Sequence, residues 1–325
     1  MSIIKSHDIT LYGGNDEYDI ILRPLSDEHL PLLYKWNSDL EVLYWTEGAD
    51  VNEPYGEETV HEIYGGVSQN AFCFLIEANG FPIGECWLQK MNMPNVLAMY
   101  PDNTDVRRID MSIGEKDYWN KGIGTQFVRM LVDFAFQGER VDVLHCFCED
   151  YNKRSQRVWE KNGFALVQKV KHRYSSKSEY EYHYVLTRQQ YIEKHRVLIP
   201  EDRVFMMPIL DLQPSQLYIS SGKLALAREW FDPSDCSQMD PIPVKEFLGK
   251  KMMTDGHTRA VLAYLSGFYE VPCYMDPDDL DMKAYEKCID WCNEEGIFGI
   301  ADLAKRIVSF KDYEVLWRKR CMEEL

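Results

Sequence analysis

The sequence predicts an α/β protein of the α+β type, with a mixed central sheet covered by helices on both faces and a second, smaller α/β domain. Three observations support this. Strand-like apolar runs alternate with amphipathic helical stretches over the first 190 residues. Asn79-Gly80, between two apolar runs, is typical of a β-hairpin turn. The charged stretch Arg188 to Pro200 reads as a linker, and 325 residues suit two domains, here 1–190 and 191–325.

The first elements follow from hydrophobic patterning and from capping residues. Ile20 to Arg23 is a strand-like run, and Ser26 or Asp27 can cap a helix that continues to about Asn37. A helix is expected over residues 57–68, followed by the two hairpin strands, 72–77 and 83–89. A polar loop, 91–105, then leads to a strand over 109–113.

A glycine-containing turn, W-N-K-G-I-G-T from Trp119 to Thr125, comes between that strand and an amphipathic helix. Gly122 and Gly124 leave room for a ligand to approach the unpaired backbone N–H groups at the helix start, where the helix dipole also favours an anion. The turn therefore suits phosphate, although most such glycine pairs are ordinary turns. The remaining elements expected before the linker are strand 141–148, helix 155–162, strand 164–173 and strand 180–186.

This order of strand, glycine turn, helix, strand and short helix resembles the GNAT superfamily of acetyl-CoA-dependent N-acetyltransferases, over roughly the first 190 residues. Trp119 stands where the family has Gln or Arg, and Trp159 where it usually has the Tyr that protonates the leaving thiolate. The resemblance implies acetyl-CoA as cosubstrate, with an oxyanion site on the strand amides. The residues that it assigns to acetyl-CoA are Met111, Ile113, Asn120, Lys121, Gly122, Ile123, Gly124, Thr125, Asn152 and Ser155.

Two segments resemble aminoglycoside 6'-N-acetyltransferases: Leu22 to Gly48, and the strand element Arg108-Ile109-Asp110. The strand element matches the Arg-Gly-Ile-Asp of these enzymes, with Arg108 where they have Gly. This implies a 6'-amine as the acceptor, with Asp110 as the base. Because no cysteine or serine sits with a base at nucleophile spacing, we expect direct attack on acetyl-CoA in a ternary complex. Alternatively, Asp110 pairs with Arg107 or Arg108 and is structural. Ribosomal-protein and other peptide N-acetyltransferases share parts of this pattern and remain an alternative.

The charge balance narrows the class of partner. The chain has 53 acidic against 36 basic residues, a net charge of −17, which disfavours nucleic acid and anionic membranes and suits a cationic amine. Acidity for solubility alone is the other explanation. The residues expected to contact such a substrate, each of which could instead be a solvated surface group, are Trp45, Glu47, Asp50, Glu149 and Asp150.

The cysteines and the first residues indicate a cytoplasmic protein without a metal. The start, MSIIKSHD, has no apolar core of the length that export requires. Nine scattered cysteines suit a reducing compartment. The pairs Cys146/Cys148 and Cys288/Cys292 lack a second pair at zinc-ligand spacing, so we expect buried thiols and no metal.

The second region resembles the ParB/sulfiredoxin-like fold over about 70 residues, through the strand Pro-Ile-Pro-Val from Pro241, a turn that opens a helix, and a closing Val-Pro strand. The turn residues Gly256, His257, Thr258 and Arg259 could hold the phosphate of a nucleotide. Alternatively, this is a tight turn whose arginine pairs with a carboxylate. A nucleotide-responsive protein with an inactive acetyltransferase half is therefore a rival function. Lys283 to Leu325 read as two or three amphipathic helices.

Overall fold

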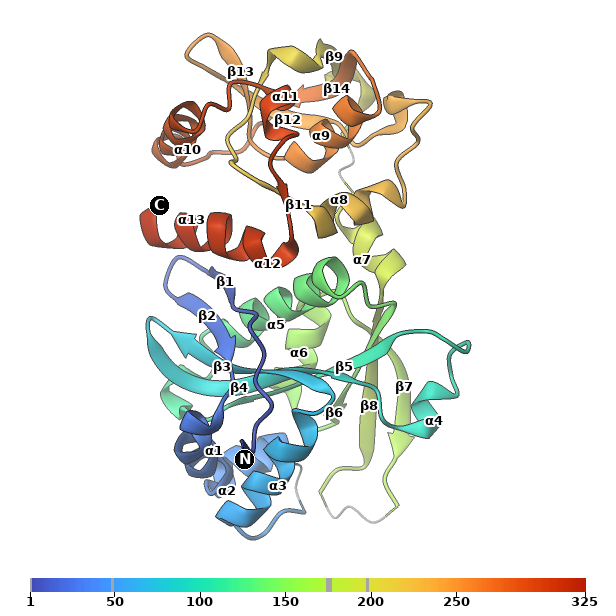
Figure 1. The fold of residues 1–325 in the computed structure, drawn as a ribbon. Coiled ribbons are helices and arrows are strands. Elements are labelled where there is room, and N and C mark those ends of the chain that lie inside the picture. The colour runs from blue at the N-terminus through green and yellow to red at the C-terminus, as the bar shows by residue number, and fades with distance from the viewer. Residues whose placement is uncertain (1, 48–49, 174–176, 197–198) are drawn as a thin grey trace. The chain divides into compact units, whose positions relative to one another are not determined.

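The computed structural model describes residues 2–47, 50–173, 177–196 and 199–325. It divides into two units, Met1–Tyr191 and Ile192–Leu325 (Figure 1). Among the described residues, no helix has both the length and the apolar character needed to cross a bilayer.

The first unit contains a sheet of eight strands in the order β1-β2-β3-β4-β5-β6-β8-β7. Only the pairing of β5 with β6 is parallel, so the predicted mixed sheet is confirmed. The short strand β1, which contains two glycines, was not predicted. The strands are β1 (Leu11–Gly14), β2 (Asp19–Pro24), β3 (Ala71–Ala78), β4 (Phe81–Lys90), β5 (Val106–Ile113), β6 (Val143–Glu149), β7 (Ala165–Lys171) and β8 (Tyr180–Thr187).

Helices cover both faces of this sheet, as predicted. Leu33 of α1 and Tyr64 of α3 pack with Cys73 on one face, and Phe134, just after α5, contacts Phe72 and Phe74 on the other. The helices are α1 (Leu30–Asn37), α2 (Leu40–Thr46), α3 (Glu57–Val67), α4 (Pro94–Leu97), α5 (Ile123–Asp133), α6 (Lys153–Lys161) and α7 (Arg188–Lys194). Short 3₁₀ helices occupy Asp27–His29 and Lys116–Tyr118, and a π-helical turn, Phe134–Gly138, extends α5.

The hairpin turn between β3 and β4 is confirmed. Asn79 and Gly80 both have positive φ, at 49° and 79°. A two-residue turn with positive φ at both positions matches the twist of the flanking strands, and Asn-Gly adopts it at low cost. This turn joins β3 to β4, and a register shift at Ile76 and Glu77 follows it before Leu75 pairs with Glu85. On its other side, β4 places Glu85 and Trp87 beside β5.

Two helices were not predicted from the sequence. Trp45 belongs to α2, which Asp39 caps by accepting a hydrogen bond from the Glu41 N–H at 2.9 Å. The predicted linker is wrong at its start, where α7 begins. Thr187 and Gln190 form a reciprocal capping box at that helix, with bonds of 3.2 and 2.9 Å. Residues 197 and 198 of the predicted linker lie outside the described residues.

The strands β5 and β6 are paired over a very short distance. Their parallel ladder includes Val106 with Val143 and Arg107 with Leu144, and the chain of β5 continues for six residues beyond it. The N–H of Ile109 still points toward β6, since it donates to Sγ of Cys146 at 3.4 Å. Alternation along the strand directs the amides of Met111 and Ile113 to the same edge, where no β6 ladder accepts them.

The second unit has a five-stranded sheet in the order β10-β13-β12-β14-β9 and a small pair, β11-β15. The predicted Pro-Ile-Pro-Val strand is β12, the helix after Gly256 is α9, and the closing strand is β14. The strands are β9 (Phe205–Pro208), β10 (Leu212–Gln213), β11 (Ile219–Ser220), β12 (Ile242–Phe247), β13 (Lys250–Met253), β14 (Glu270–Met275) and β15 (Ile307–Val308). The helices are α8 (Ser221–Arg228), α9 (His257–Leu265), α10 (Met282–Glu294), α11 (Ile300–Leu303), α12 (Phe310–Tyr313) and α13 (Lys319–Glu324).

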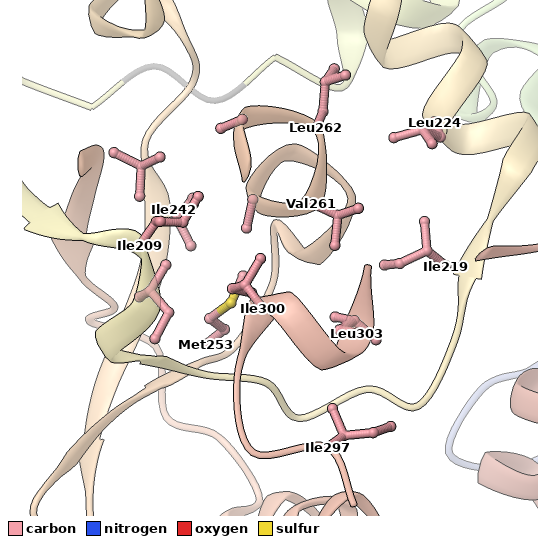
Figure 2. Packing of buried hydrophobic residues seen from close by; sticks show 14 of the residues in the cluster. Ile209, Ile219, Leu224, Ile242, Met253, Val261, Leu262, Ile297, Ile300 and Leu303 are labelled. Carbon is pink, nitrogen blue, oxygen red and sulfur yellow. The ribbon is translucent and has the colours of Figure 1, made fainter. Parts of the chain in front are cut away.

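The core of the second unit lies between its sheet and helices. Figure 2 shows Ile242 of β12, Val261 of α9 and Ile300 of α11 in this cluster, and all three side chains are buried. The predicted C-terminal helices are present as α10 to α13, with a π-helical turn, Glu314–Arg318, between the last two.

Candidate active site

A pocket of about 1080 Å³ opens in the first unit, lined by parts of α2, β4, β5, the glycine turn, β6 and α6. Most residues that the sequence assigned to acetyl-CoA line it. Lys121 is exposed and Ile123 is fully buried at the start of α5, and these two do not. The assigned residues in the pocket wall are Met111, Ile113, Asn120, Gly122, Gly124, Thr125, Asn152 and Ser155.

The glycine turn presents a helix start to the pocket. Gly122, with φ of 80°, is the N-cap of α5, and a side chain at that φ would strain the backbone. Gly124 in the first turn adds no side chain between the pocket and the helix amides. The first amides of a helix have no partners within the helix, so this end of the pocket suits an anionic group.

Asn152 has a structural task that sequence reasoning did not foresee. Its Oδ1 accepts from the Ser155 N–H at 3.1 Å, which caps α6, and its Nδ2 donates to the carbonyl oxygen of Trp45 at 3.0 Å. The residue is 8% exposed. Asn152 therefore ties α6 to α2 at the edge of the pocket.

Neither aromatic residue near Asn152 is an evident acid for a departing thiolate. Trp159 is 1% exposed and packs against Phe164, as expected of a packing residue. The Tyr151 hydroxyl donates to the carbonyl of Tyr44 at 2.7 Å, and burial raises its pKa to about 12. Of the described residues that line the pocket, only Tyr64 has a phenol.

Arg154 is a pocket residue that the sequence did not single out. Its guanidinium lies between the rings of Trp45 and Trp119, 4.1 and 4.6 Å from their centroids. Stacking between two indoles holds a cation by cation–π attraction. The three residues are far apart in the chain. The sequence singled out Trp45, as an expected substrate contact, and Trp119, as an unusual residue beside a glycine turn, but gave no sign that they meet.

The pocket wall formed by β4 and β5 is strongly polar. Alternation along each strand and the pairing of the two place three cross-strand pairs on the same face of the sheet. These are Glu85 with Ser112, Trp87 with Asp110, and Gln89 with Arg108. All six residues line the pocket.

Asp110, the predicted base, is held by two donors. Its Oδ2 accepts from Nε of Arg108 at 2.6 Å and from Nε1 of Trp87 at 2.8 Å. The ion pair with Arg108, which is the structural alternative for Asp110, is therefore present. Burial raises the pKa of Asp110, and the charge of Arg108 lowers it. A carboxylate held in this way, with 30% of its side chain exposed, can still face a ligand in the pocket.

Two further acids stand near Asp110. Burial, followed by the charge of Asp110, raises the pKa of Glu47 and raises the pKa of Glu85 well above its usual range. Glu85 was missed by sequence reasoning, although a single acid inside an apolar strand was a signal. It is 5% exposed, and its Oε2 has no hydrogen-bond partner among the described residues. Such a buried carboxyl is kept protonated unless a cation approaches it.

Of the five predicted substrate residues, three line the pocket and two lie outside its wall. Trp45, Glu47 and Glu149 line the pocket. Asp50 is exposed and lies outside the wall. Asp150 also lies outside, because its carboxylate accepts from Oγ of Ser178 and from two backbone N–H groups of the chain that enters β8.

In the second unit, the four predicted turn residues surround the start of α9. Gly256, with φ of 80°, is the N-cap, and His257 Nε2 accepts from the Ser215 N–H at 3.0 Å. Thr258 is half-buried. The Arg259 side chain is 10% exposed and lies 3.8 Å from carboxylates of Asp240 and Asp255. Its Nη2 has no hydrogen-bond partner in the described part of the chain.

Comparisons with known proteins find a family match and relatives for part of the chain. Residues 19–165 match the model of the acetyltransferase (GNAT) domain family. The chain is 27% identical over 167 residues to aminoglycoside N(6')-acetyltransferase type 1 of Klebsiella pneumoniae, and equally to that of Serratia marcescens, covering 48% of this chain and 80% of each relative.

Among solved structures, an aminoglycoside acetyltransferase in complex with coenzyme A is 24% identical, with a TM-score of 0.46 over 55% of this chain and 99% of that one. Spermidine N-acetyltransferase from Vibrio cholerae, in complex with coenzyme A and spermine, is 15% identical, with a TM-score of 0.45 over 55% and 99% of the two chains. The chain thus contains a GNAT acetyltransferase domain, similar over about half of its length to aminoglycoside 6'-N-acetyltransferases, and the protein is an N-acetyltransferase.

Proposed function

We propose that the protein transfers the acetyl group of acetyl-CoA to a primary amine of a cationic small molecule, with the 6'-amine of an aminoglycoside as the best candidate. The observation that carries this proposal is the concentration of acids in one pocket, Glu47, Glu85, Asp110, Glu149 and Glu181, next to the glycine turn. These acids attract an ammonium group, while basic residues of the same wall, among them Arg154 and Arg157, suit the anionic coenzyme.

The glycine-turn end of the pocket fits acetyl-CoA. The amides at the start of α5 bind the diphosphate, with Gly122 and Gly124 leaving space for it. Arg154, held between Trp45 and Trp119, adds a cation at this end and offsets the absence of the family's Gln or Arg. The thioester lies along the open edge of β5, where the amides of Met111 and Ile113 stabilise the tetrahedral oxyanion.

The acidic end binds the amine. A carboxylate about 4 Å from an ammonium gains about 4 kcal/mol at an effective dielectric constant near 20. Asp110 binds the ammonium of the acceptor and takes its proton, because its exposed edge faces the pocket and its pKa is raised by burial. Its contacts with Arg108 and Trp87 orient the carboxylate for this task.

Acetyl transfer takes place by direct attack of the amine, without an acyl-enzyme. The pocket has one thiol among its described residues, Cys148, and burial raises the pKa of this group to about 12. A thiol of that pKa stays protonated and is a poor nucleophile. With Trp159 at the usual phenol position, the coenzyme A thiolate takes its proton from water.

A competition of acceptors tests this function. The full chain and acetyl-CoA are assayed with kanamycin-type aminoglycosides, spermidine and N-terminal peptides of ribosomal proteins, with release of the coenzyme A thiol as the readout. We expect the highest kcat/KM for aminoglycosides. A higher kcat/KM for the peptides would contradict the aminoglycoside as acceptor, while acetyl transfer to an amine would remain the reaction. Mass spectrometry of the product then locates the acetylated amine.

We further propose that the second unit is a separate ParB/sulfiredoxin-like domain that binds a nucleotide at Gly256, His257, Thr258 and Arg259. The supporting observation is the buried Nη2 of Arg259, which lacks a hydrogen-bond partner among the described residues beside the start of α9. A phosphate oxygen would satisfy this donor. Isothermal titration with ATP and CTP tests the idea, with Arg259→Gln as the variant and Arg228→Gln as control. Equal binding heats for wild type and both variants would show that no nucleotide binds at these residues.

A further inference from the structure

Four side chains form a hydrogen-bonded chain that leads out of the pocket. The Tyr100 hydroxyl lies 2.8 Å from Nδ1 of His145, and Nε2 of His145 lies 2.9 Å from Nδ1 of His183. Nε2 of His183 lies 3.1 Å from Oε1 of Glu181. Both ring nitrogens of each histidine are therefore engaged, and each imidazole can accept a proton on one side and release it on the other.

The two ends of this chain lie in different surroundings. Glu181 lines the pocket, and 30% of its side chain is exposed. Tyr100 belongs to the segment between α4 and β5, outside the pocket wall, and is partly exposed. The histidines between them are buried, at 0% for His145 and 2% for His183. The chain thus connects the pocket, through the interior, with a partly exposed phenol.

Placement on the sheet explains how the chain is built. His145 and Glu149 of β6 point to the same face as His183 and Glu181 of β8, because register pairs Phe147 with His183 and Glu149 with Glu181. An apolar residue would fill each buried position without the cost of burying an imidazole. Burial, together with the neighbouring His183, lowers the pKa of His145 to about 4, so this ring is neutral at rest.

The reaction needs an exit for a proton. The acceptor enters as an ammonium, R–NH3+, and leaves as the amide R–NH–CO–CH3, while the coenzyme A thiolate takes up one proton to become the thiol. The new C–N bond replaces the broken C–S bond, and one proton remains for each turnover. The pocket must return this proton to solvent before the next cycle.

We propose that Glu181, His183, His145 and Tyr100 form the route by which this proton leaves the pocket. The inference rests on acetyl transfer to an ammonium and not on which amine is the natural acceptor. A proton taken from the ammonium reaches Glu181 through pocket water. Its arrival at His183 releases the proton of the other ring nitrogen to His145, and a second such step passes a proton to Tyr100 and to solvent.

Several charged groups near this route act on Glu181. The hydrogen bond from His183, opposed by burial, lowers the pKa of Glu181, and the charges of His172 and Arg108 act in the same direction. His172 itself is bonded to Glu149 at 2.8 Å. Cys146, on the opposite face of β6, has a pKa raised by burial and carries no charge.

The experiment compares His183→Gln and Tyr100→Phe with a matched control, His7→Gln. Glutamine keeps a hydrogen-bonding group and cannot relay a proton, and Phe removes only the hydroxyl. His7 is also partly buried and bonded, to the Cys73 carbonyl at 2.9 Å, but lies away from the pocket. We measure kcat and KM of the full chain with acetyl-CoA and a cationic amine that wild type acetylates, at low buffer and with added imidazole.

We expect both route variants to lose about tenfold in kcat with little change in KM, and imidazole to restore much of the loss. His7→Gln should match wild type and show no response to imidazole. A purely structural role predicts a loss that imidazole does not repair, and that outcome, or wild-type kcat in both variants, overturns the route. If His183→Gln fails to fold, Tyr100→Phe, at a partly exposed position, decides the question alone. If the protein acetylates other amines but not aminoglycosides, only the proposed acceptor is wrong and the proton route still stands. If it acetylates no amine, both the proposed function and the proton route are wrong.

Discussion

The guanidinium of Arg108 donates from Nε to Oδ2 of Asp110 over 2.6 Å, two residues apart on one strand and on one face of the sheet. The pair lines the pocket, where Trp87 supplies a second donor to the same oxygen. Asp110 can therefore be both an ion-pair partner and a base, and its chemistry depends on how strongly Arg108 holds it.

Replacing Asp110 with Asn should lower kcat by at least tenfold, because the amide can neither bind the ammonium by charge nor take its proton. Steady-state acetyl transfer at saturating substrates measures this. The control is Asp105→Asn, which removes a carboxylate paired to Arg107 outside the pocket, with contacts of 2.9 and 3.0 Å. That change should lower stability and leave kcat unchanged. Wild-type turnover in Asp110→Asn would show that Asp110 is structural.

Replacing Arg108 with Gln should move the acidic limb of the kcat/KM profile to higher pH. Burial raises the pKa of Asp110 while Arg108 lowers it, so loss of the cation leaves burial unopposed and raises this pKa further. The base is then protonated, and inactive, up to a higher pH. A pH–rate profile from pH 5 to 9 measures the shift. An unmoved or acid-shifted limb contradicts the role of Asp110 as base.

Replacing Glu85 with Gln should stabilise the protein, and by more as the pH rises. The folded-state pKa of Glu85 lies well above its usual value, so between the unfolded and folded pKa values the folded state binds the extra proton. Wild-type stability therefore falls as pH rises through this window, and Gln removes that loss. Thermal unfolding from pH 4 to pH 8 measures the difference.

The control for this change is Glu77→Gln, since Glu77 pairs with Arg23 at 2.6 Å. Gln at that position should bring no stabilisation at any pH. A Tm difference between Glu85→Gln and wild type that stays constant from pH 4 to pH 8 would exclude the protonated state of Glu85.

Replacing Gly124 with Leu should weaken coenzyme A binding at least tenfold, because the side chain enters the space beside the helix amides. Titration calorimetry measures the affinity. Gly124→Ala is the graded control, since its methyl would meet only Cγ2 of Val158, at an ordinary contact distance of 3.4 Å. If the Leu variant and wild type bind coenzyme A with equal affinity, the glycine turn does not bind the phosphate groups.

Local patterns predicted the elements whose causes lie within a few residues. The Asn79-Gly80 turn and the glycine turn at Gly122 both have the positive φ that glycine permits. Helices α2 and α7 were not predicted, although Asp39 and the Thr187–Gln190 box mark their starts. The charged residues of α7 are equally typical of a linker.

Features of the pocket that combine distant residues could not be predicted. Arg154 stacks between two tryptophans from other elements, and Glu85 became a pocket residue only through its pairing with β5. Asn152, expected at acetyl-CoA, lines the pocket, while its contact with the Trp45 carbonyl depends on the approach of α2 to α6.

The sequence by itself determined most strands of the first unit, the glycine turn and the excess of acid, because turn conformation, hydrophobic alternation and charge are properties of neighbouring residues. The enzyme class came from the resemblance of this ordered set to a known family. Tertiary structure decided which acids share a pocket, which donors hold Asp110, and that His145 and His183 join in one chain. These outcomes depend on strand register and on the early end of the β5–β6 ladder, which bring together side chains that are far apart in sequence.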